Sequence, residues 1–158
     1  MTVMRKVLVG VAAGAMLFGL AACDAPSTEG GEEGAAATVE SVGISMPTRE
    51  LERWINDGEG LKALLEEDGF TADLQYAEND PDTQISQIQN QIAAGVDVLV
   101  VAAIDGSVLA PTLQDAADAG ITVIAYDRLI NGTENVDYYA TFDNYKVGQL
   151  QGEFIRDN

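Results

Sequence analysis

The chain has 158 residues, with 8 Lys and Arg against 26 Asp and Glu, no His and one Cys, which gives a formal net charge of −18. Without histidine there is no imidazole base for a Ser–His or Cys–His nucleophile and no His ligand for a metal. One cysteine cannot form an intrachain disulfide or a thiolate zinc cage, and the negative charge argues against nucleic acid as a partner. We therefore expect a globular chain with no metal site and no cofactor.

Residues 1–22 are predicted to be a signal peptide. Two basic residues precede an apolar stretch, 7–20, which is too short to span a bilayer. The segment 20–23 (LAAC) resembles the lipobox of bacterial lipoproteins. That resemblance implies cleavage before Cys23, a lipid thioether on its sulfur and attachment to a membrane. A signal peptide without lipid is the alternative, but the single cysteine falls at the one position where lipidation needs a thiol.

Residues 23–37 are predicted to be a flexible tether. They are rich in Gly, Ala, Glu, Ser and Thr and contain almost no bulky apolar residue, so they cannot bury a core. A tether suits an anchor, because it would hold the following domain away from the membrane surface.

Strands and helices are predicted to alternate along residues 38–158. The predicted strands are residues 38–46, 71–76, 96–103, 121–126 and 136–142. The predicted helices are one capped by Thr48 and ended by Gly69, one from Asp82 to Gly95, one over 108–119 and one from Asn144 onward. This β-α-β-α-β-α-β-β-α order predicts an α/β fold with a doubly wound parallel sheet and right-handed crossovers. The last helix has little closing signal, so we expect the chain to be truncated within it.

Polar residues are concentrated just after the predicted strands. In open α/β sheets the ligand crevice lies outside the carboxyl ends of the strands. Three of the six basic residues beyond the signal peptide follow the first or fourth strand, namely Arg49, Arg53 and Arg128. The acidic and amide side chains at strand ends are Asp105, Asp127, Asp143 and Asn144.

This set of side chains suits the binding of sugar hydroxyls. Each hydroxyl is both a donor and an acceptor, so an Asp beside an Arg or Asn can satisfy it, as in Asp127-Arg128 and Asp143-Asn144. Trp54 offers a flat face on which a pyranose can stack. Alternatives stay open: Trp54 can be a core residue, Asp127-Arg128 a solvated loop pair, Asp143 a helix cap and Asp105 part of a turn.

Six segments resemble the type I periplasmic sugar-binding proteins of ABC importers, and the xylose and multiple-monosaccharide-binding branch most of all. They are ISMPTR at 44–49, ERW at 52–54, QISQI at 84–88, GVDVLV at 95–100, AYDRLI at 125–130 and YATFDN at 139–144. The resemblance implies that residues 38–158 are the N-terminal lobe of a two-lobed protein. Such a protein closes on one monosaccharide of the xylose, glucose, galactose or arabinose type. It then passes the sugar to a membrane permease and ATPase, outside the cytoplasm.

The resemblance also implies roles for individual residues. Arg49 and Arg53 would bind hydroxyls, and Trp54 would contribute to the pocket wall. Asp127 and Arg128 would be the central contacts. Asn144 would be a further donor, with Asp143 holding its loop, and Asp105 is a candidate contact. Members of the family are at least twice as long, so we expect this chain alone to bind weakly.

Three other functions compete with sugar import. A repressor-type effector domain would need a helix-turn-helix before the fold, where the signal peptide stands. A lipid-anchored α/β enzyme would need a nucleophile elbow or a phosphate loop, and the sequence has neither, so we expect no enzyme. An extracytoplasmic sugar receptor for chemosensory signalling stays open.

Overall fold

The structure is a computed structural model that describes residues 39–158. The predicted signal peptide, Cys23 and the predicted tether lie outside the described residues. One five-stranded sheet has the order β2-β1-β3-β4-β5, and every neighbouring pair of strands is parallel. The strands are β1 Ser41–Met46, β2 Thr71–Tyr76, β3 Val98–Val101, β4 Thr122–Tyr126 and β5 Tyr138–Ala140. The predicted parallel α/β sheet is confirmed.

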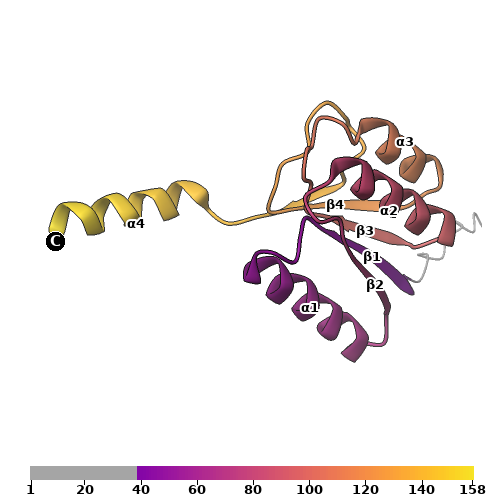
Figure 1. Ribbon diagram of the computed structural model, residues 1–158, viewed down its shortest axis with the longest axis horizontal. Coiled ribbons are helices and arrows are strands. Elements are labelled where there is room, and N and C mark those ends of the chain that lie inside the picture. The colour runs from indigo at the N-terminus through magenta and orange to yellow at the C-terminus, as the bar shows by residue number, and fades with distance from the viewer. Residues whose placement is uncertain (1–38) are drawn as a thin grey trace, which may run out of the picture. The chain divides into compact units, whose positions relative to one another are not determined.

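The four helices of the described chain are α1 Glu52–Glu67, α2 Pro81–Ala94, α3 Ala110–Asp118 and α4 Asn144–Asp157. The first three cover the two faces of this sheet, and α4 does not. Figure 1 shows α1 on one face of the sheet and α2 and α3 on the other. Two buried clusters follow from this arrangement, one around Trp54 and Ile44 and one around Ile88 and Leu113. The central strands are apolar on both sides because both sides are covered.

Three helix starts differ from the prediction, and one of them is that of α3, which begins at Ala110 rather than at residue 108. Thr48 does not cap α1: its Oγ1 accepts the Glu50 N–H at 3.0 Å, and Leu51 occupies the cap position without a side-chain hydrogen bond. This hydrogen bond belongs to a tight turn between β1 and α1, so the Thr48 hydroxyl does not accept an N–H of the helix. Helix α2 begins at Pro81, one residue early, because the Asp80 carboxylate accepts the Thr83 N–H at 2.6 Å.

Helix α4 differs from the other three described helices in having no buried residue. Its exposed apolar side chains are Tyr145, Val147, Leu150, Phe154 and Ile155. Amphipathic helices of globular proteins bury such a stripe against another element. None of the helices described within residues 39–158 is long and apolar enough to cross a membrane.

Candidate functional site

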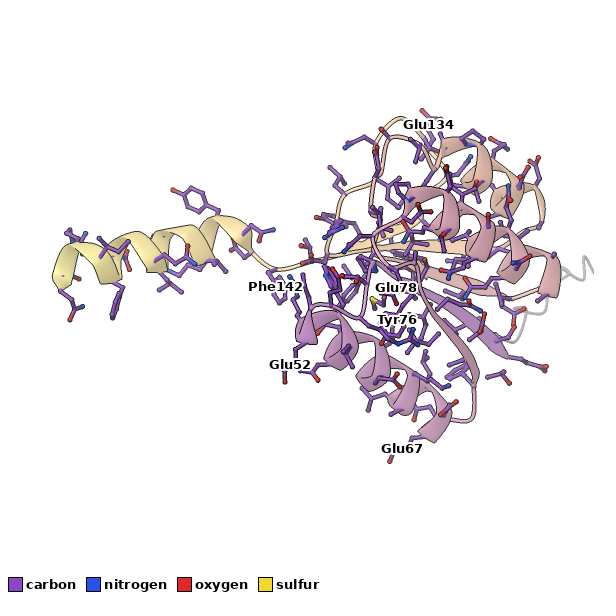
Figure 2. The ribbon with its side chains drawn as sticks, in the orientation of Figure 1. Glu52, Glu67, Tyr76, Glu78, Glu134 and Phe142 are labelled. Atoms are coloured by element: carbon purple, nitrogen blue, oxygen red, sulfur yellow. The ribbon has the colours of Figure 1, made fainter. Side chains whose placement is uncertain are left out.

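The carboxyl ends of the parallel strands meet at one edge of the sheet, and the candidate site lies there. Figure 2 shows Glu52 at the start of α1 and Phe142 after β5 at this edge, with Glu67 at the opposite end of α1. Parallel pairing brings the loop after β1 and the residues after β4 and β5 to the same edge. Side chains far apart in the sequence are therefore neighbours here.

The closest contact of the site joins Arg53 to Asp127. Arg53 Nη2 donates to Asp127 Oδ1 at 2.6 Å and links the first turn of α1 to the residue after β4. The Asp127 side chain is only 17% exposed, so water screens this pair less than it screens a pair on an open surface. The hydrogen bond to Asp127 raises the pKa of Arg53 above its ordinary value. The pair therefore places a positively charged hydrogen-bond donor, Arg53, next to a negatively charged acceptor, Asp127.

The backbone of Asp127 is fixed from β5. Its φ is 60°, in the left-handed region that Asp tolerates better than most residues. Its N–H donates to the Ala140 carbonyl at 2.7 Å. Its own carbonyl accepts the Tyr139 hydroxyl at 3.0 Å and the Thr141 hydroxyl at 3.4 Å. Tyr139 and Thr141 therefore support Asp127, a role that the sequence did not suggest.

Arg128 and Trp54 form the inner layer of the site. Arg128 Nη1 donates to the Ala103 carbonyl at 2.9 Å, and its guanidinium lies 5.0 Å from the Trp54 ring centroid. Arg53 lies 4.7 Å from the same ring. Trp54 is only 3% exposed, so its indole packs in the core beneath two cations rather than on the surface. This placement matches the alternative interpretation, in which Trp54 is a core residue.

Phe142 is an exposed aromatic side chain at this edge. It is 57% exposed, and the Arg53 guanidinium lies 5.1 Å from its ring centroid. With Tyr126, Asp127, Ala140 and Thr141 it lines a hollow of about 190 Å³. Sequence analysis missed Phe142, although an apolar residue directly before the polar couple at 143–144 was a usable signal.

The structure does not bring Arg49, Asp105 and Asn144 into this cluster. Arg49 lies over Tyr76 at 4.1 Å and pairs with Glu78 at 3.5 Å, both at the end of β2. Asp105 accepts the Ser107 N–H at 2.8 Å and hydroxyl at 2.6 Å, and these hydrogen bonds lower its pKa. Asp105 is thus part of a turn, which was the alternative interpretation of this residue.

The residues after β5 begin α4. Asp143 caps this helix by accepting the Lys146 N–H at 2.9 Å, which matches the cap alternative. Asn144 is the exposed first residue of the helix. No group of three or more His, Cys, Asp or Glu residues suited to a metal ion occurs in the part of the chain that the structure describes.

In doubly wound sheets ligands bind in the crevice outside the carboxyl ends of the strands, and this is the edge at which the charged donors and acceptors are paired here. Residues 42–158 match the family described as periplasmic binding protein domain. The chain belongs to this family, whose members are substrate-binding proteins. Its predicted resemblance to the type I periplasmic sugar-binding proteins is confirmed.

Several named relatives share this region. The chain is 55% identical over 117 residues to the multiple sugar-binding periplasmic protein SbpA of Azospirillum brasilense, covering 74% of this chain and 33% of that protein. It is 54% identical over 122 residues to the multiple sugar-binding periplasmic receptor ChvE of Rhizobium radiobacter, covering 77% of this chain and 34% of the receptor. The chain thus spans about a third of the length of these relatives.

A solved structure with a bound sugar has the same fold. It is an ABC transporter solute binding protein from Clostridium phytofermentans with bound β-D-glucose. It is 51% identical with a TM-score of 0.72, and the match covers 75% of this chain and 36% of that one.

Proposed function

We propose that this chain is one lobe of an extracytoplasmic binding protein that holds a monosaccharide between two lobes for an ABC importer. The observation that carries the proposal is the Arg53–Asp127 pair beside Arg128 at the carboxyl edge of the sheet. Relatives that are 54–55% identical over this region carry names of sugar-binding proteins. The ligand would be a sugar of the xylose, glucose, galactose or arabinose type.

The chemistry of the pair fits a hydroxylated ligand. A sugar hydroxyl can donate to an Asp127 oxygen while it accepts from an Arg53 or Arg128 N–H, because a hydroxyl has both capacities. Hydrogen bonds to charged groups are stronger than neutral ones, which offsets the cost of removing the sugar from water. The exposed ring of Phe142 offers an apolar surface to the C–H face of the sugar. These contacts bind the ligand and make or break no bond, so the proposed function is not enzymatic.

A single lobe supplies one wall of a cleft. Since the relatives are about three times as long as the matched region, we propose that a second lobe provides the opposite wall. The 158-residue chain would then bind a monosaccharide much more weakly than a two-lobed protein, because the sugar keeps one side in water.

Calorimetry on two proteins tests the binding proposal. One is the 158-residue chain, and the other is a chimera in which the remaining sequence of the Rhizobium radiobacter relative follows Asn158. Both are titrated with D-xylose, D-glucose, D-galactose and L-arabinose. We expect the chimera to bind at least one of them with a micromolar or lower Kd and the chain alone to bind far more weakly. Equal affinity of the two proteins would overturn the two-lobed part of the proposal.

Substitutions in the chimera connect that binding to the site. Asp127→Asn keeps the shape and the tolerance of a positive φ but removes the charge, so we expect Kd to rise about tenfold or more. Asp115→Asn, on the exposed side of α3, is the matched control and should leave Kd unchanged. A chimera that binds none of the four sugars would overturn the proposed function.

We also propose that a lipid on Cys23 holds the protein at the membrane. The LAAC segment and the absence of any other cysteine support this. Labelled palmitate should enter the expressed protein and be lost with Cys23→Ser. Import rather than chemosensory signalling is tested by sugar uptake: deletion of the gene should reduce uptake, and unchanged uptake with lost chemotaxis would reverse the assignment.

A further inference from the structure

A second carboxylate, that of Asp57, contacts Arg53 through a different nitrogen of the guanidinium. Arg53 Nε donates to Asp57 Oδ2 at 3.4 Å, one helical turn further along α1. The Arg53 guanidinium therefore bridges two carboxylates on different elements, through Nε to Asp57 and through Nη2 to Asp127. Because a guanidinium is planar and rigid, two such contacts fix its orientation as well as its position.

Asp57 lies near the end of the sheet. Its carboxylate is close enough to the hydroxyl of Tyr126, the last residue of β4, to affect the pKa of that hydroxyl. Burial raises the pKa of Tyr126, and the neighbouring Asp57 carboxylate raises it further. The Asp57 side chain is only 25% exposed. Arg53 thus connects Asp57, on α1, with Asp127, which follows β4.

We propose that Asp57 is a positioning residue of the ligand site, which aims the Nη groups of Arg53 at Asp127 and at the crevice. The inference rests on the proposed sugar-binding function. With Nε held by Asp57 and one Nη2 hydrogen given to Asp127, the remaining N–H groups are free for ligand oxygens. Pre-organised donors lower the cost of ordering the side chain when the ligand arrives.

The competing interpretation is an ordinary surface pair of a helix. Acidic and basic residues four apart on an exposed helix face interact weakly and do nothing for a ligand. The same helix contains such a pair, Lys62 and Glu66, at 3.7 Å, in which the carboxylate side chain is 51% exposed, compared with 25% for Asp57. Glu66 is therefore a matched control for Asp57, with the same spacing on the same helix.

Sugar binding by the chimera described above provides the first test. We expect Asp57→Asn to raise Kd about tenfold and Glu66→Gln to leave it unchanged, with similar thermal midpoints for both variants. In an Arg53→Met background Asp57→Asn should have no further effect, because the group that it positions is absent. Asp57→Glu keeps the charge on a longer arm and should fall between wild type and Asp57→Asn.

The orientation of Arg53 provides a second test that needs no sugar. In the ¹⁵N spectrum of the 158-residue chain, the Arg53 Nε–Hε signal should be ordered and slow to exchange. Asp57→Asn should make it mobile and fast to exchange, whereas Glu66→Gln should leave it unchanged.

The outcomes separate the two hypotheses. If the wild-type chimera binds a sugar and Asp57→Asn binds it equally well, the positioning role is overturned and the proposed function stands. If the wild-type chimera binds none of the sugars, the proposed function falls and the positioning role falls with it. An Arg53 signal that Asp57→Asn leaves unchanged also overturns the positioning role.

Discussion

Asp127 combines three tasks in one residue. Its carboxylate holds Arg53, its carbonyl accepts two hydroxyl groups, and its φ of 60° turns the chain at the end of β4. A positive φ costs most L-residues about 1 kcal/mol or more, and Asp, Asn and Gly tolerate it best. The position therefore accepts few residue types, and Asn is the replacement that changes the charge with the least effect on the backbone.

Two glycines of α1 are expected to respond oppositely to alanine. A Cβ at Gly58 would lie 2.8 Å from the buried Tyr76 hydroxyl oxygen and 3.1 Å from Leu74 Cδ1, whereas a Cβ at Gly60 meets nothing within 4 Å. Gly60→Ala should raise the free energy of unfolding by about 0.5–1 kcal/mol, because alanine favours the helix. Gly58→Ala gains the same propensity but overpacks the contact with β2, so we expect a net loss of about 1–2 kcal/mol.

Urea unfolding of the two variants at neutral pH checks this pair. Both variants replace glycine by alanine in the same helix, half a turn apart. The gain in helix propensity is therefore the same for both and cancels when their free energies of unfolding are compared. If Gly58→Ala were stabilising as well, α1 would not be pressed against Tyr76 in solution.

At the scale of the elements, much of the fold could be predicted from sequence patterns. The apolar run at 96–103 and the helical spacing of Ile85, Ile88 and Ile92 indicated a buried strand and an amphipathic helix, and both are present. Strand ends were less predictable, because β3 spans only Val98–Val101, where it pairs with β1 and β4. Hydrogen bonds with neighbouring strands set those ends, and apolar content alone does not reveal them.

The candidate site was predictable to the extent that topology determines it. Arg53, Asp127 and Arg128 meet because parallel strands bring their carboxyl ends to one edge. The burial of Trp54 and the exposure of Phe142 depend on how α1 and the β5 loop pack, which residue spacing does not show. Asp57 was missed because an Arg–Asp pair four residues apart looks in sequence like any exposed helix pair.

Asp97 joins the starts of β1 and β3, and its charge should make the fold sensitive to acid. Its carboxylate accepts the Glu40 N–H at 2.9 Å, the Ser41 N–H at 2.8 Å and the Ser41 hydroxyl at 2.9 Å. These hydrogen bonds lower the pKa of Asp97, and the one from the Glu40 N–H has the largest effect. A lowered pKa in the folded state contributes stability above the unfolded value, about 3.9, and this contribution is lost as the pH falls through the folded value.

The stability of the wild type should therefore decline more steeply below about pH 4 than that of Asp97→Asn, in which the side chain at position 97 has no proton to gain. Urea midpoints measured from pH 6 down to pH 3 give the comparison. Asp115→Asn serves as the control, since its exposed carboxylate should leave the wild-type profile in place. Parallel profiles for wild type and Asp97→Asn would contradict the assignment.

At the scale of the whole molecule, we expect α4 to contribute little to the free energy of unfolding and the buried residues of α3 to contribute much more. None of the residues of α4 is buried, so removing residues 144–158 should change the free energy of unfolding of the chain by less than about 0.5 kcal/mol. By contrast, Leu113→Ala on α3 removes a fully buried side chain and should cost about 2–5 kcal/mol. Urea unfolding of the shortened chain and of the Leu113 variant measures both effects.

We expect the exposed apolar face of α4 to pack on the second lobe proposed above. In the 158-residue chain, Leu150→Asp places a charge on an exposed helix face and should leave the stability nearly unchanged. In the chimera a second lobe would bury this face, and an unpaired carboxylate there should lower the free energy of unfolding by about 3 kcal/mol or more. Gln151→Asp, on an exposed neighbouring position, is the control in both proteins. If Leu150→Asp were as harmless in the chimera as in the chain alone, α4 would not pack on a second lobe through this face.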